Sequence, residues 1–189
     1  MMAKVYFVRH GQTQSNANGV IHGATDIPLN DVGRVQAAET GKRLRDIKFD
    51  AVYASPLSRA RETCEIILKH NKFGGKIKFD DRLKERNFGI LEGIELKDPR
   101  FNGISNANNE KFIQGCETLA QLFGRVGDFL RSLKAKGNIL VVSHCAVERM
   151  VYFHFNPKPA DGNLRVRAIP NAEIAEYDLN LFPQNVTLV

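Results

Sequence analysis

The chain has 189 residues, of which 43% are hydrophobic and 25% are charged, and its formal net charge is +6. This length and composition are typical of one soluble globular domain with a sizeable core. No apolar stretch approaches the length of a membrane span and no run of Lys and Arg resembles a nucleic-acid-binding tail, so we expect no membrane and no nucleic-acid partner. The positive charge favours an anionic ligand.

The cysteines and the N-terminus indicate the compartment. Three cysteines, an odd number, are spread along the chain without Cys-x-x-Cys spacing, as is typical of reduced thiols. The N-terminus lacks the basic-then-apolar pattern of a signal peptide, because its apolar run is short and is cut by Arg9. We therefore expect a cytoplasmic protein.

The first predicted element is a buried strand over Val5–Val8, a run rich in β-branched and aromatic residues. The strand ends abruptly at Arg9 and His10, followed by Gly11. Ligands of open α/β sheets bind beyond the carboxyl ends of strands. Arg9 and His10 therefore lie where a binding site is expected.

The next elements alternate between helix and strand. A polar loop over Gln14–Ile27 leads to a helix that begins after Asn30, a good N-cap residue. A second buried strand spans Phe49–Ser55, and Ser55-Pro56 predicts the start of the following helix. Lys76–Asp80 alternates as a third, peripheral strand.

An irregular stretch separates these elements from the C-terminal half. Residues 83–93 mix charge, glycine and apolar side chains and fit neither a helix nor a strand. The polar, asparagine-rich segment Ile94–Gly115 follows. We interpret it as a small lid, because long irregular segments inside compact domains are usually functional or disordered. A continuous apolar stripe then predicts a helix over Glu117–Lys136.

The C-terminal part repeats the pattern of the first strand. Ile139–Val142 is a fully apolar strand that ends at Ser143-His144-Cys145, and a helix is expected from about Ala146. Arg165–Ile169 and Glu173–Leu179 predict a hairpin at the sheet edge.

Alternating strands and helices predict an α/β fold, a three-layer sandwich with a mostly parallel central sheet and helices on both faces. We see no repeats and no linker. We therefore expect a single domain over residues 1–189 with the small lid insertion at about 94–115.

Polar groups follow three of the predicted strands: Arg9-His10, then Ser55 leading to Arg59, then His144. If these strands are neighbours, the groups converge. Two guanidinium groups and two imidazoles repel one another unless they face an anion with more than one charge. A phosphoryl group fits, because arginine binds its oxygens through two nitrogens.

Such a pocket can transfer a phosphoryl group. A neutral imidazole is a nucleophile toward phosphorus, and neighbouring cations disfavour its protonated form. The leaving oxygen needs a proton, and Glu85 in the irregular stretch offers a carboxyl group for general acid catalysis.

The chain lacks the motifs of other classes of phosphate-transferring enzyme. No arginine stands six residues after a cysteine, and the chain contains neither a Walker motif nor an Asp-x-Asp pair. No histidine and carboxylate group shows clear metal-ligand spacing, so we expect no metal and no cofactor.

Six blocks in order along the chain resemble the histidine phosphatase superfamily, the phosphoglycerate mutase-like proteins. The combination is specific, whereas Arg-His-Gly alone is a weak signal. The blocks are Arg9–Thr13 with Asn16; His22-Gly23 with Asp26–Leu29 and Gly33; Ser55–Ala60 with Thr63; Leu83, Glu85, Gly89 and Glu92-Gly93; Gly115–Thr118, loosely; and Val141–His144.

The resemblance implies a role for each group. His10 is expected to be the nucleophile that becomes phosphohistidine, and Glu85 to protonate the leaving oxygen and then activate water. The phosphoryl oxygens are expected to be bound by Arg9, Arg59 and His144, with help from Asn16. The resemblance implies no metal.

Residues outside this core are candidates for other roles. His22, Gly23 and Arg86 are candidate contacts to the rest of the substrate, although His22 fits a solvated loop position equally well. Arg149, on the helix after His144, is interpreted as a structural ion-pair partner.

Two positions depart from the pattern of the family. Cys145 replaces the glycine that is usual after the second histidine, and it narrows the pocket or packs inward. Glu148 stands where an apolar residue is more usual.

Three functions therefore stay open: a phosphomonoesterase acting on a small phosphate ester, a phosphoglycerate mutase, and a phosphate-binding module without catalysis. Mutases of this superfamily carry a longer insertion with paired arginines, whereas this lid offers only Lys97 and Arg100. The short lid favours the phosphatase.

Overall fold

The computed structural model describes residues 3–133 and 137–183. Its centre is a five-stranded sheet in the order β3-β2-β4-β1-β5. Strands β1, β2, β3 and β4 run parallel, and β5 is antiparallel to β1 at one edge. Their bounds are β1 Lys4–Arg9, β2 Phe49–Ala54, β3 Lys78–Phe79, β4 Asn138–Ser143 and β5 Ile174–Asp178.

Alternate residues of the central strands pack into two separate hydrophobic cores, one on each face of the sheet. Val5 and Phe7 of β1 pack with Ile139 and Val141 of β4 on one face, and Val8 packs on the other. A parallel sheet covered on both faces needs such continuous apolar strands. The apolar runs at the two strands therefore reflect burial from both sides.

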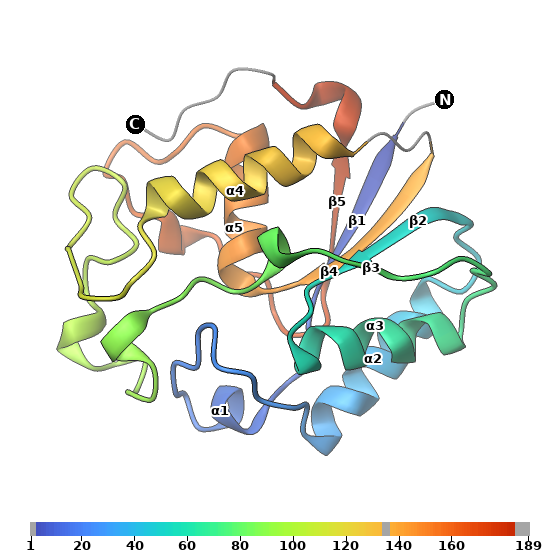
Figure 1. The fold of residues 1–189 in the computed structure, drawn as a ribbon, viewed down its shortest axis with the longest axis horizontal. Coiled ribbons are helices and arrows are strands. Elements are labelled where there is room, and N and C mark those ends of the chain that lie inside the picture. The colour runs from blue at the N-terminus through green and yellow to red at the C-terminus, as the bar shows by residue number, and fades with distance from the viewer. Residues whose placement is uncertain (1–2, 134–136, 184–189) are drawn as a thin grey trace.

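Two pairs of helices cover the sheet, as Figure 1 shows. Helices α2 (Asp31–Arg43) and α3 (Ser58–Lys69) pack together on one face, and α4 (Leu119–Ser132) and α5 (Cys145–Phe155) pack together on the other. The predicted three-layer arrangement with a mostly parallel sheet is confirmed.

Local capping explains where several helices begin. The Asn30 side chain accepts a hydrogen bond from the backbone of Gly33, as expected of an N-cap at the start of α2. Thr118 forms a capping box with Gln121 at the start of α4. Helix α3 begins at Ser58, later than predicted; the hydroxyl of Ser55 accepts from the backbone of Leu57 at 3.3 Å and also contacts His144.

The loop predicted over Gln14–Ile27 contains a short helix that was not predicted. Helix α1 (Gln14–Ala17) is capped by Thr13 and Asn16 in a reciprocal capping box. The capping residues therefore belong to the motif Arg9–Thr13 with Asn16, and their bonds fix this loop beside the end of β1.

The predicted hairpin is wrong in its first arm. Residues 165–169 form no strand and contain only part of a 3₁₀ turn, Leu164–Val166, whereas the second arm is β5. The backbone of this segment is engaged elsewhere: Leu164 donates to the carbonyl of Ser105, and the carbonyl of Ile169 accepts from Arg9. The alternating pattern of the segment therefore reflects contacts with the irregular loops and not strand pairing.

The segment interpreted as a lid has one 3₁₀ turn, Pro99–Phe101. Its apolar residues Phe101 and Ile104 form a small cluster with Ile21, Phe88 and Leu91, apart from the two cores on the sheet. The segment is thus held on the loops that border the carboxyl ends of the strands. Its function as a lid stays a prediction.

Candidate active site

Strands β2, β4 and β1 are adjacent, which is the condition for their polar ends to converge. Arg9 at the end of β1 is in register with Ser143 at the end of β4. The rings of His10 and His144 lie 5.1 Å apart between centroids, and the rings of His10 and His22 lie 6.0 Å apart. Three imidazoles from distant parts of the chain therefore meet at one edge of the sheet.

His10 is held as a neutral imidazole with one defined tautomer. Its Nδ1 lies 2.7 Å from the backbone carbonyl of Gly11, and because a carbonyl only accepts, Nδ1 carries the hydrogen. Burial, followed by the charges of Arg59 and Arg9, lowers the pKa of His10 well below its ordinary value. The lone pair is therefore on Nε2, which is the form that a nucleophile requires.

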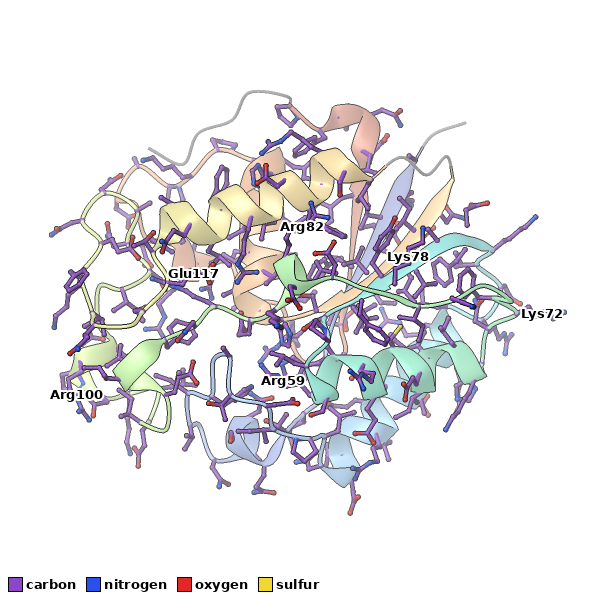
Figure 2. The ribbon with its side chains drawn as sticks, viewed as in Figure 1. Arg59, Lys72, Lys78, Arg82, Arg100 and Glu117 are labelled. Atoms are coloured by element: carbon purple, nitrogen blue, oxygen red, sulfur yellow. The ribbon has the colours of Figure 1, made fainter. Side chains whose placement is uncertain are left out.

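Arg59 lies in the first turn of α3 (Figure 2). It is a fully buried cation. Its terminal nitrogens donate to the carbonyls of Gly23, at 2.7 Å, and Thr25, at 2.9 Å. Burial lowers the pKa of Arg59 to about 10, so the guanidinium stays charged at neutral pH. The loop after His22 is thus tied to the cation by its backbone.

His144 lies beside His10 and is also fully buried. Its Nε2 is 2.8 Å from the hydroxyl of Ser55, which joins the ends of β4 and β2. Burial and the charge of Arg59 lower the pKa of His144 well below its ordinary value. Four buried polar nitrogens here have no hydrogen-bond partner among the described residues: Arg9 Nε, His22 Nδ1, Arg59 Nε and His144 Nδ1.

Unpaired buried donors and acceptors are costly, and their concentration around one point is typical of a binding site.

Arg9 uses one terminal nitrogen to bind the carbonyl of Ile169 at 2.7 Å. Asn16 accepts from the backbone of Thr13 and from the side chain of Asn171, which also donates to the carbonyl of His10. Asn171 was not among the predicted site residues, and it fixes both the Asn16 side chain and the backbone at His10.

The carboxylate of Glu85 is held beside the start of α5. It accepts from the backbone of Arg86 at 2.9 Å and from the backbone of Ala146 at 3.2 Å. This second bond comes from the first turn of the helix that follows His144. Glu85 and the second histidine are therefore positioned by the same strand-to-helix connection.

A cavity of about 300 Å³ opens over these groups. This volume is at the lower end of the range for small-molecule sites. The structure brings six of the predicted residues to its wall: Arg9, His10, Asn16, His22, Gly23 and Glu85. Arg59 and His144 lie buried behind it. Burial of His22, followed by the positive charge of Arg59, lowers the pKa of His22 to about 4.

Arg86 does not reach this cavity. Its side chain is buried and donates to the carbonyls of Glu117 and Ile104 and to the carboxylate of Glu110. The guanidinium therefore joins residues 104–117 to the rest of the domain. We remove Arg86 from the candidate substrate contacts, because its donors are already used inside the protein.

Two arginines on the cavity wall were missed. Arg149 was expected in a structural ion pair, but it has no carboxylate within 4 Å among the described residues and its Nε donates to the carbonyl of Arg167. Arg165 lies in the 3₁₀ turn that was predicted as a strand. Helical spacing could have indicated Arg149, because it stands four residues after Cys145 and so shares its face of α5.

Residues 3–133 and 137–183 contain no group of three or more His, Cys, Asp or Glu side chains placed to hold a metal ion. Within the same residues, no helix is both long and apolar enough to cross a membrane.

Comparison with known proteins gives a match to the histidine phosphatase superfamily (branch 1) over residues 5–183. The chain is 31% identical to "Uncharacterized phosphatase PhoE" of Bacillus subtilis, over 98% of the chain and 95% of that protein. It is 33% identical to "Probable phosphoglycerate mutase GpmB" of Erwinia tasmaniensis, over 94% of the chain and 85% of that protein.

The match to a third relative covers a smaller part of that protein. The chain is 39% identical to "Fructose-2,6-bisphosphatase TIGAR" of Bos taurus over 67% of the chain, but the match spans only about half, 48%, of that protein. Among solved structures, Bacillus stearothermophilus YhfR superimposes with a TM-score of 0.81 and 26% identity, over 92% of this chain and 90% of that one.

Proposed function

Because the chain belongs to the histidine phosphatase superfamily (branch 1), we propose that it is a metal-independent phosphomonoesterase acting on a small phosphorylated metabolite. The proposal rests on one observation above all: a neutral His10 with its Nε2 lone pair free stands at the wall of a cavity backed by Arg59 and His144. The partner is a small phosphate ester and neither a nucleic acid nor a membrane.

In the first step Nε2 of His10 attacks phosphorus. The P–N bond forms as the ester P–O bond breaks, and Arg9, Arg59 and His144 donate hydrogen bonds to the phosphoryl oxygens. Preorganised donors of this kind stabilise the charge that develops in the transition state, and removing one typically costs about a hundred- to a thousandfold in rate. Asn16 contributes its amide at the same place.

Glu85 acts as the general acid in the first step and as the general base in the second. In its protonated form it gives a proton to the leaving oxygen, so that the alcohol departs neutral. The resulting carboxylate then takes a proton from water, which attacks phosphorus as the P–N bond breaks. Inorganic phosphate leaves, and His10 and the protonated Glu85 are regenerated.

The lid supports hydrolysis over mutase chemistry. Lys97 pairs with Glu95 and Arg100 pairs with Asp98 on the surface, and neither cation lines the cavity. The lid therefore supplies no cation to hold an organic acceptor in place during phosphoryl return. Similarity to proteins named as probable mutases keeps that activity as the second candidate.

The test is phosphate release from para-nitrophenyl phosphate with excess chelator, for wild type, His10→Ala and the control His70→Ala. His70 is an exposed histidine at the end of α3, so its replacement preserves activity. We expect chelator-resistant activity that is lost only in His10→Ala, and acid-labile phosphate on His10 in the quenched wild type.

Equal activity in His10→Ala and wild type would contradict the proposed mechanism. No aryl phosphatase activity in wild type, together with turnover in a mutase assay primed by a bisphosphate, would establish the second candidate instead. No turnover in either assay would leave a phosphate-binding module.

A further inference from the structure

The cavity over His10 has more positive charge than one phosphoryl group requires. Arg149 and Arg165 line it in addition to Arg9, and Glu85 is the only carboxylate among the described residues of its wall. Glu85 is itself bound by two backbone amides at the start of α5. The two additional cations therefore need a separate explanation.

Arg149 is directed to the cavity by the geometry of α5. It stands one turn after Cys145, and long side chains of a helix lean toward the N-terminal turn, which here borders the site. Its Nε donates to the carbonyl of Arg167 at 2.8 Å, and its only other contact of this kind is a long one, 3.9 Å, to Cys145 Sγ within the described part of the chain. The terminal nitrogens of a fixed guanidinium are thus available to a ligand.

Arg165 approaches from a different segment. Its guanidinium lies over the ring of Phe101, 5.1 Å from the centroid, and so rests on the segment 94–115. The neighbouring Leu164 donates to the carbonyl of Ser105, which also lines the cavity. No carboxylate lies within 4 Å of Arg165 among the residues that the structure describes.

A buried acid, Glu148, positions Arg149 indirectly, through Arg167. The carboxylate of Glu148 is fully buried and accepts from Arg167, at 2.7 Å, and from the hydroxyl of Tyr177, at 2.6 Å. Arg167 in turn binds Arg149 through its carbonyl. The unusual acid at position 148 therefore has a structural reason, because it anchors the segment that orients Arg149.

We infer that the substrate carries a second anionic group, a phosphate or a carboxylate, and that Arg149 and Arg165 bind it. This inference rests on the proposed function for the first group, which Arg9, Arg59 and His144 hold beside His10. Like charges that line one cavity repel one another, and a second anion removes that repulsion. Arginine suits either anion, because its planar fork matches both.

The test compares two matched pairs of substrates. Glycerol 3-phosphate with 3-phosphoglycerate adds a carboxylate, and a hexose monophosphate with the hexose bisphosphate adds a phosphate. For wild type we expect kcat/KM to be about ten- to a hundredfold higher for the member with the second anion, as for a charge-assisted hydrogen bond. The pair with the larger ratio identifies the second anion.

Arg149→Gln and Arg165→Gln are each expected to reduce that ratio about tenfold, whereas Arg45→Gln keeps the wild-type ratio. Arg45 is an exposed arginine paired with Asp46, and it does not line this cavity. Because Arg165 is exposed, its variant keeps the fold even if Arg149→Gln does not.

Dissociation constants measured by calorimetry on His10→Ala, in which turnover is blocked, decide the inference without catalysis. Equal affinity for both members of each pair, or equal loss for both members in the two arginine variants, would overturn it. If wild type shows no chelator-resistant turnover, the proposed function is refuted instead. A higher affinity for the member of each pair with the second anion would then still identify a two-anion ligand.

Discussion

Gly11 and Gly33 bring the backbone of α2 against the loop that follows His10. A β-carbon on Gly33 would lie 2.1 Å from the carbonyl oxygen of Gln12, and a β-carbon on Gly11 would lie 2.4 Å from the carbonyl oxygen of Gly33. The contact is reinforced by Asn30, whose backbone N–H donates to Gln12. The position of His10 therefore depends on the absence of a side chain on α2.

We expect Gly33→Ala to destabilise the protein although alanine is the better helix former. The overlap demands roughly 1 Å of backbone movement, and a misplacement of that size can cost about a hundredfold in rate. Overpacking of this kind costs about 1–3 kcal/mol of unfolding free energy, which exceeds the gain of about 1 kcal/mol in helix propensity over most of that range. Both stability and kcat should fall together.

Gly124→Ala on α4 is the matched control. Gly124 is exposed, and a β-carbon there meets nothing within 4 Å. This variant should gain about 0.5–1 kcal/mol and keep its activity. Urea unfolding and aryl phosphate turnover measure both variants. A Gly33→Ala protein with the stability and kcat of wild type would refute the packing argument.

Other predictions concern buried groups. Lowering the pH from 6.5 to 4 should reduce the unfolding free energy. The folded protein lowers the pKa of His22 to about 4, so the unfolded chain takes up a proton first as the pH falls. In urea unfolding, His22→Gln should remove about 3 kcal/mol of that loss. The imidazole of His10 should stay neutral at pH values just below 6.5 in NMR titrations, and a midpoint at or above the ordinary value would contradict its burial. Glu148→Ala should cost about 3 kcal/mol, because it leaves Arg167 and the hydroxyl of Tyr177 without their acceptor. Tyr177→Phe should cost about half as much.

Continuous apolar runs predicted the central strands, because these strands are buried on both faces. The runs at Val5–Val8 and Ile139–Val142 have no polar residue that a solvated strand would carry, and both proved central. Polar residues that end such runs predicted the placement of His10 and His144 for the same reason. Parallel strands bring their carboxyl ends to one edge of the sheet, so adjacency alone was enough for convergence.

The errors fall where side chains contact segments distant in sequence. Arg86 and Arg149 both lie close to site motifs, but only contacts with other loops decide which guanidinium is consumed inside the protein. Arg165 stands in an alternating pattern that fits a strand, and no local signal indicates that the backbone of the neighbouring Leu164 bonds to Ser105 in the segment 94–115. Sequence patterns report local burial and leave such partners unspecified.

The sequence by itself determined the family, the layered fold and the convergence of His10 and His144 at one edge of the sheet, because each depends on local burial and on short motifs at strand ends. Only the tertiary structure decided which further cations reach the cavity. Arg149 and Arg165 come from a helix and a loop that meet through Arg167 and Glu148. Their meeting is a property of packing between distant segments, and the polar groups of an irregular loop can be satisfied by many partners until packing selects one.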